Sequence, residues 1–554
     1  MKHIFKNILT ILFVSFLIVS CEDMLDVDSP RIIKESDNQL NSPNDSIYSM
    51  AGILAQLQNV AERYVLLGEL RADLMDVTQF ADQDLIELRN NDISVDNKYN
   101  NVKDYYNIIN NCNYVIKNID TSVIAKGQKA LLKEFAAAKA IRAWTYMQIA
   151  LNYGSVKYYT EPILSVDNIN DNVPVYDFYN LALELVKDLD PWKDIEDPGF
   201  GMVGEFYSGY LFIPIRFILG DLYLWLAKDN DKGYFEKAAI EYHDLIYNEE
   251  ARISHTYTSE REVNNGEFTG GITYTWQNSF NNSLEMICFI GTSYEYNRGS
   301  RLYNMTTGST YSLTTSDVAV GNWATQIYYN DSVLQTFGDL RGHNGSYYDI
   351  EILYNESDQI GNIDISEYDN IILKYIPSFY ENGERVILCR SSLLYLRYAE
   401  AVNRLGKPNT AFAVIKNGLT QMSLSDTTII PKWEKSTPLD NYMDFTASFF
   451  IPTTRNRGNT GIHARGCGNI ADVDSYKIPV LANLDDSIAY VEDLIQQELA
   501  LETAFEGNRF QDLMRFALRT DNPETYMVDK ISKKNPISGA RLANKQNWYL
   551  PREE

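Results

Sequence analysis

The sequence predicts a mostly α-helical single domain over residues 46–554, built from stacked helical hairpins that carry one long loop-rich insertion. Two observations predict this fold class. Apolar residues recur at helical spacing through most of residues 46–250 and 391–520, which indicates amphipathic helices. That period disappears over residues 251–390, where Gly, Asn, Ser, Thr and Tyr dominate and the β-like runs are short. A second irregular segment is expected at 427–485.

Length and composition place the chain among globular proteins. It has 554 residues, of which 45% are hydrophobic and 22% charged, and this balance indicates neither a disordered chain nor a membrane bundle. Its formal charge at pH 7 is −26, from 49 basic and 75 acidic residues. An excess of that size repels nucleic acid and anionic membrane surfaces, so we predict no nucleic-acid partner.

The sequence carries no recognisable metal, cofactor or nucleophile motif. Its five cysteines include no CxxC pair, and its five histidines include no pair with metal-ligand spacing. We therefore predict no metal, no cofactor and no catalysis, although 75 acidic residues leave a glycosidase carboxylate pair open. An oxidising compartment would permit one disulfide, but the sequence does not say between which cysteines.

The N-terminus reads as a bacterial export signal. Lys2 and Lys6 precede the apolar run 8–19, which is too short to span a bilayer comfortably and is typical of a signal peptide over residues 1–20. The run closes on Cys21 in a sequence that resembles a lipobox, so we expect Cys21 to carry lipid. An ordinary signal peptide with an incidental cysteine is the alternative. Residues 21–45 are acidic and turn-rich, which predicts an extended tether.

Helices are predicted in turn along the first part of the domain. Apolar stripes and small residues at helical spacing indicate them. The expected helices are residues 47–60, a continuation over 66–76, then 105–119, 130–153 and 175–189, with a polar loop at 79–101.

Two further segments resemble the helix pairs of tetratricopeptide (TPR) repeats. Residues 210–227 contain Leu219-Gly220-x-x-Tyr223, which matches the core of a TPR helix, and residues 234–247 supply its partner. In residues 393–419, Ala399 and Ala411 are spaced like the small interface residues of a TPR hairpin. Each such pair buries one face against a neighbour, so TPR-like hairpins must stack.

A literal GxGxxG occurs at residues 199–204 but lacks the context of a nucleotide site. A turn, Asp197-Pro198, precedes it, and no βαβ pattern surrounds it. We therefore interpret this stretch as a loop.

The final helices carry the most specific signal. Residues 486–516 predict two helices broken near Gly507, with Asn508 as N-cap of the second. Within them, Glu498-Leu499 and then Phe505-Glu506-Gly507-x-Arg509-x-x-Asp512-Leu513-x-Arg515 resemble the C-terminal signature of the SusD/RagB family, outer-membrane nutrient-binding lipoproteins of Bacteroidetes-type bacteria. The family usually has Trp where this chain has Phe516. We expect these charges to tie helices together.

The resemblance implies a function. It implies a lipoprotein on the outer membrane, facing the cell exterior and touching the membrane only through its lipid. It implies capture of an oligosaccharide and delivery to a SusC-like TonB-dependent transporter, without catalysis. It also implies four TPR-like units. Uptake of peptides is the alternative within the family; a surface glycosidase or a purely structural helical-repeat adaptor are alternatives outside it.

The predicted ligand-binding residues are mostly aromatic. Aromatic planes bury the apolar faces of sugar rings, while polar tips and amides take the hydroxyls. The insertion is rich in such side chains, and long loops on a rigid scaffold often carry function. We predict a platform of Trp276, Tyr294, Tyr296 and Trp323, with core packing as the competing role of each. The family resemblance adds Arg71, for which a salt bridge is the alternative.

Overall fold

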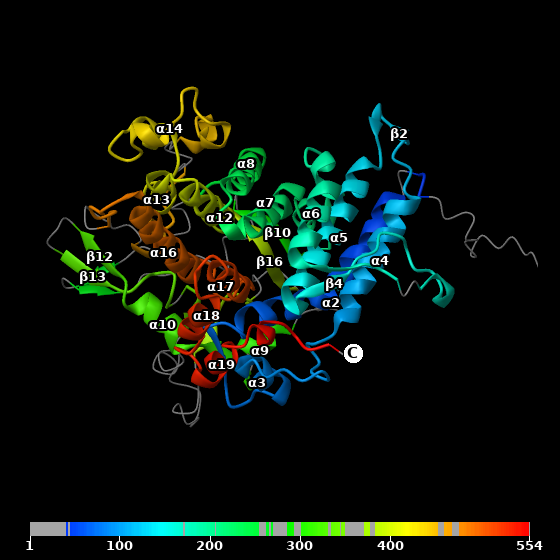
Figure 1. Ribbon diagram of the computed structural model, residues 1–554, viewed down its shortest axis with the longest axis horizontal. Coiled ribbons are helices and arrows are strands. Elements are labelled where there is room, and N and C mark those ends of the chain that lie inside the picture. Colours follow the sequence, from blue (N-terminus) through cyan, green and yellow to red (C-terminus); the bar gives the residue numbers. More distant parts are fainter. Residues whose placement is uncertain are drawn as a thin grey trace, which may run out of the picture.

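The computed structural model describes most of the helical scaffold and parts of the insertion (Figure 1). The described residues are 40–42, 45–169, 172–204, 206–253, 262–264, 267–269, 285–292, 301–307, 309–330, 334–343, 345–348, 370–376, 383–451, 459–467 and 476–552.

Long helices form the scaffold, standing side by side from α4 at one end of the view to α13 and α16 at the other (Figure 1). Consecutive helices pack as antiparallel hairpins, α4 on α5, α7 on α8 and α12 on α13. The scaffold helices are α2 (Asp45–Glu69), α4 (Val102–Asn118), α5 (Leu132–Tyr153), α6 (Phe178–Leu189), α7 (Ile215–Leu226), α8 (Lys232–Asn248), α12 (Ser391–Arg404), α13 (Pro408–Lys416), α16 (Leu484–Glu502), α17 (Arg509–Ala517), α18 (Pro523–Ile531) and α19 (Pro536–Arg541). The predicted mostly helical, stacked architecture is confirmed.

Small residues set how closely these helices approach. Gly220 of α7 faces Tyr242 of α8, and a Cβ on Gly220 would lie 2.4 Å from the tyrosine ring. That distance explains the glycine of the TPR-like motif, because any side chain there would push the hairpin apart. Ala137, Ala138 and Ala140 serve the same purpose in α5, where they are buried.

The described strands are short and pair two by two. Each sheet has two strands. The longest pair joins β10 (Met286–Gly291) to β16 (Arg385–Arg390) antiparallel, and β16 leads directly into α12. This pair therefore fastens an inner segment of the insertion, β10, and its last residues, β16, to the scaffold. β1 (Met75–Val77) pairs with β11 (Leu313–Thr315) and fixes a second point of the insertion.

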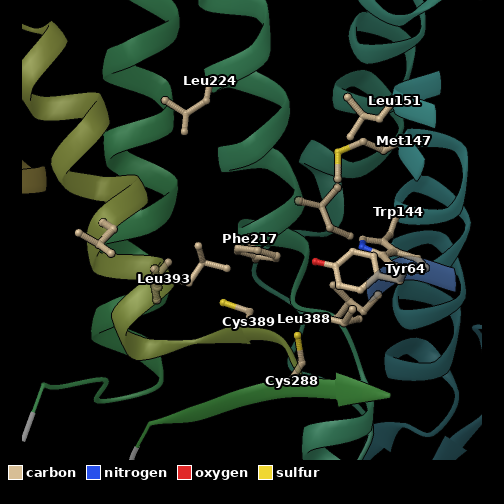
Figure 2. Close-up of a cluster of buried hydrophobic side chains, with 14 of the residues drawn as sticks. Tyr64, Trp144, Met147, Leu151, Phe217, Leu224, Cys288, Leu388, Cys389 and Leu393 are labelled. Carbon is tan, nitrogen blue, oxygen red and sulfur yellow. The ribbon is translucent and has the colours of Figure 1, made fainter. Parts of the chain in front are cut away.

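The core continues from the helices onto β16. Tyr64 of α2, Trp144 of α5 and Phe217 of α7 meet Leu388 of β16 in one buried cluster (Figure 2). The stretch Ser208–Leu226 is long and apolar enough to cross a membrane, but 83% of it is buried within the protein. It is therefore accounted for as a core helix.

A carboxylate from α2 caps α17. The Glu69 side chain accepts hydrogen bonds from the backbone N–H groups of Gly507 (2.8 Å), Asn508 (3.1 Å) and Arg509 (3.4 Å) at the start of α17. These groups have no partner within their own helix, and the positive end of the helix dipole favours a carboxylate. Asn508, which the sequence predicts to be the capping side chain, makes no cap bond; its Oδ1 instead accepts from the Tyr64 hydroxyl at 3.0 Å.

Glu502 of α16 lies at the centre of a buried ion network. The Glu502 carboxylate forms salt bridges with the guanidinium groups of Arg390 (2.8 Å), Arg465 (2.6 Å) and Arg341 (3.1 Å). All of these side chains are buried. Arg390 also pairs with Glu506 at 2.9 Å. The signature residue Glu506 therefore ties the last helices to β16, which agrees with the structural role expected for the signature charges.

Four element boundaries differ from the sequence prediction. The helix expected over 66–76 ends at Glu69, because the chain turns there to place Glu69 at α17. The loop expected at 79–101 contains a helix, α3 (Gln83–Asn90), capped by Asp82. Val175–Asp177 is strand β5, paired with β4 (Ser155–Lys157), rather than the start of a helix. The GxGxxG stretch contains a strand of a small hairpin, described below.

Candidate functional site

Three of the predicted platform residues, Trp276, Tyr294 and Tyr296, lie outside the described residues. The fourth, Trp323, does not belong to an open platform. It lies in α10 (Asp317–Ala324), is 2% exposed, and its indole N–H donates to the Leu501 carbonyl at 3.0 Å. Its ring stacks on Tyr347, with centroids 5.7 Å apart. The prediction for Trp323 is corrected: packing between α10 and α16 requires its large ring in the core.

Arg71 is also a structural residue. It is fully buried, its Nε donates to Asn91 Oδ1 at 2.9 Å, and its Nη2 donates to the Trp548 carbonyl at 2.8 Å. The guanidinium lies over the Phe510 ring, 4.1 Å from its centroid. Neither a ligand contact nor the alternative surface salt bridge fits this position. Arg71 instead joins the C-terminal segment to the scaffold.

A cavity lined by described residues opens beside β10. Its volume is about 290 Å³, and its walls come from the N-terminal half of α2, from β10 and from the hairpin β6 (Met202–Val203) and β7 (Phe206–Tyr207). The lining residues are Ile47, Ala51, Leu54, Ala55, Leu57, Gln58, Phe200, Val203, Gly204, Phe206, Leu211, Phe289, Ile290, Gly291 and Thr292. Most of them are apolar, so the cavity suits an apolar surface of a ligand.

Aromatic contacts fix the shape of the inner wall. Phe206 and Phe289 meet edge to face, with ring centroids 5.2 Å apart. The Arg385 guanidinium lies over both rings, 5.4 Å and 5.2 Å from their centroids, and so closes this side of the cluster with a cation. Tyr210 packs against the same group, and its burial, reinforced by the Glu249 carboxylate, raises the pKa of its hydroxyl.

Local sequence explains the hairpin that forms the lip of the cavity. Gly201 and Gly204 have φ of +74° and +58°, a region that glycine enters without strain. In the stretch 199–204, Gly204 thus begins the turn of the hairpin, and Gly201 directly precedes strand β6. The turn leaves Met202 and Tyr207 exposed, at 62% and 54%, while Phe206 points inward.

Polar groups at the rim are few. Gln58 Nε2 donates to the Gly291 carbonyl at 2.9 Å, and Thr292 exchanges hydrogen bonds with Glu384 across the strand pair. The lining residues include no Asp, Glu or His. In the part of the chain that the structure describes, no group of three or more His, Cys, Asp or Glu side chains is placed to hold a metal ion.

Sequence reasoning missed this cavity. One signal was available: Phe200 and Phe206 are large apolar side chains in a stretch otherwise rich in glycine and polar residues. The sequence does not show that these side chains line one cavity, because the cavity depends on the contact between α2 and β10. Thr292 of the lining is two residues before Tyr294 in the sequence.

The chain was compared with known protein families, curated proteins and solved structures. No model of a protein family matches the sequence. The SusD-like protein P25 of Formosa agariphila is 27% identical over 175 residues, which span 29% of this chain and 32% of that protein.

Solved structures match over nearly the whole chain. A SusD homologue from Bacteroides thetaiotaomicron superposes with a TM-score of 0.54 at 14% identity, covering 91% of this chain and 97% of the other. A SusD-like carbohydrate-binding protein from Bacteroides fragilis gives 0.55 at 12% identity, with 88% of each chain covered. A protein from Bacteroides vulgatus, described as sugar-binding, gives 0.55 at 16% identity, covering 86% of this chain and 88% of the other. The chain therefore has the fold of these SusD-like structures.

Proposed function

We propose that the chain is a cell-surface lipoprotein that binds an oligosaccharide and delivers it to a SusC-like TonB-dependent transporter, without chemical change. The single observation that supports it most is the SusD fold over about nine tenths of the chain, shared with proteins described as sugar- or carbohydrate-binding. The N-terminal sequence with Cys21 supports the surface anchor, and the transporter follows from the resemblance in the last helices.

The cavity beside β10 is the proposed place of binding. Its phenylalanine and aliphatic walls match the C–H face of a sugar ring, and its volume of about 290 Å³ suits part of an oligosaccharide rather than a long chain. Tyr294 and Tyr296, which follow the wall directly in sequence, are proposed to supply polar tips for the hydroxyls.

A variant at the cavity mouth tests this assignment. Ala51 is exposed on α2 and lines the cavity, so Ala51→Trp fills the mouth without disturbing the core. The chain without residues 1–21 is screened by calorimetry against glycans and peptides. We expect a glycan to bind and the variant to weaken it at least about tenfold, or about 1.4 kcal/mol.

The matched control is Asn59→Trp, on the exposed side of the same helix and outside the lining. It should leave the affinity unchanged. Equal affinity of Ala51→Trp and the parent chain would remove the cavity from the site while leaving the function open. Clear peptide binding with no glycan binding would favour the peptide-uptake alternative.

The glycosidase alternative finds no support at this cavity. Glycoside hydrolysis needs two carboxyl groups flanking the bond, and the lining residues include none. Release of reducing sugar by the purified chain, lost on replacing a single carboxylate, would restore that alternative.

A further inference from the structure

β10 and β16 bring two cysteines together. Cys288 lies opposite Cys389 in the antiparallel ladder, and both are buried with free thiols. On either side of the pair the register is regular, Met286 opposing Arg390 and Phe289 opposing Ile387. It shifts only at Cys288, so the irregularity itself places the cysteines opposite each other.

The local geometry suits a covalent link. Directly opposed residues of an antiparallel pair have Cα atoms about 4.5–5.5 Å apart, inside the range of about 4.4–6.8 Å found for disulfides. In a regular ladder, successive side chains alternate between the two faces, so without the shift Cys389 would point away from Cys288. Figure 2 shows both side chains directed into the same hydrophobic cluster, with Leu388 beside them.

The two cysteine thiols can react only while they are accessible to solvent. Burial raises the pKa of both thiols well above the ordinary value, so in the folded chain they stay protonated and shielded from exchange. A bond must therefore form while the chain folds, and once formed it is equally shielded from reductants.

We propose that Cys288 and Cys389 form a disulfide when the chain folds in oxidising surroundings. Two thiols lose two protons and two electrons to a disulfide oxidant, which becomes two thiols, and one S–S bond forms. The bond would close residues 289–388, about 100 residues, into a loop and restrict the unfolded chain accordingly. It would also hold β10 beside β16 next to Phe289, which lines the cavity.

Peptide mapping tests the pairing. The chain without residues 1–21 is reduced in denaturant, refolded with oxidised and reduced glutathione, alkylated in denaturant without reductant, and digested with trypsin. We expect the peptide 262–298, which contains Cys288, to be joined to the peptide 386–390, which contains Cys389. Cys112, buried alone in α4, should be fully alkylated. Complete alkylation of Cys288 and Cys389, or their pairing with other cysteines, would overturn the proposal.

Thermal unfolding gives an independent readout. Reductant present during heating reaches the bond as the chain unfolds. It should therefore lower the unfolding midpoint of the refolded parent chain and of Cys112→Ala, but not that of Cys288→Ala or Cys389→Ala. Sensitivity to reductant separates the bond from any loss of packing, which would lower all midpoints with or without reductant. A midpoint of the parent chain that does not change on reduction would count against the bond. The test needs no ligand, so its result is independent of the proposed function.

Discussion

At the scale of single residues, the main feature of this protein is a set of buried charged side chains that neutralise one another. Glu502 is fully buried and satisfied by three guanidinium groups from different elements, so its charge is compensated only in the complete fold. A buried ion pair stabilises the folded state little more than well-packed apolar side chains would. Removing one partner is nevertheless costly, because the remaining buried charges are left uncompensated. We therefore interpret the main role of the network as specifying which segments of the chain pack against α16.

Replacing Glu502 by Ala should destabilise the fold by about 3–5 kcal/mol, because three arginines would lose a shared buried partner. Urea unfolding followed by circular dichroism measures the change. The matched control is Glu161→Ala, whose partner Lys117 and own side chain are 57% and 76% exposed. That exposed pair should contribute less than about 1 kcal/mol. Equal effects of the two variants would contradict the assignment.

Glu69 should give stability a pH dependence. Burial raises the pKa of its carboxyl to about 7, against the four backbone donors that favour the charged form. The folded chain then binds a proton that the unfolded chain releases near pH 4.5, so this contribution is full below pH 4.5 and is lost as pH rises through 7.

The corresponding measurement is unfolding free energy against pH for the parent chain and Glu69→Gln. The parent chain should lose up to about 3 kcal/mol relative to the variant between pH 4.5 and 7. Parallel profiles across this window would show that the four donors keep the carboxylate charged throughout.

At the scale of elements, close approach between helices decides the packing. Gly68, near the end of α2, faces Gly507 at the start of α17, and a Cβ on Gly68 would lie 1.9 Å from the Gly507 carbonyl oxygen. Gly507 also has a φ of +90°, which other residues rarely adopt. Gly507 is thus required twice, by its own backbone conformation and by the Tyr64 ring, which lies 2.6 Å from a Cβ built on Gly507.

Gly68→Ala should destabilise the protein by about 1–3 kcal/mol or more, because the backbones must separate to admit a methyl group. Gly52, on the same helix, has nothing within 4 Å of an added Cβ. Gly52→Ala should therefore stabilise by about 0.5–1 kcal/mol through helix propensity. Thermal unfolding of the two variants measures this contrast, and a neutral Gly68→Ala would refute the close contact.

At the scale of the whole molecule, a helical scaffold supports an insertion that is fastened to it at several points. β10 and β16 fasten it beside the core, β1 and β11 fasten it again, and the Glu502 network joins it to α16. The cavity lies where the first of these anchors meets α2. A rigid base of this kind can hold variable loops in place.

Membrane attachment is the prediction that concerns the whole chain. Cys21 lies outside the described residues, so the sequence alone supports its lipidation. In cells, the parent chain should take up labelled fatty acid and sediment with the outer membrane, whereas Cys21→Ser should do neither, because firm anchoring requires the acyl chains. A Cys21→Ser chain that still takes up label would place the lipid elsewhere.

The amino-acid sequence alone predicted the mostly helical scaffold and the resemblance in the last helices. It could do so because periodicity, glycine and capping signals act over a few residues. The three-dimensional structure was needed to show that Trp323 and Arg71 are buried, that Glu69 caps a helix more than 400 residues away, and that Cys288 opposes Cys389. Those features, like the cavity, arise from contacts between distant segments, whose partners no local pattern specifies.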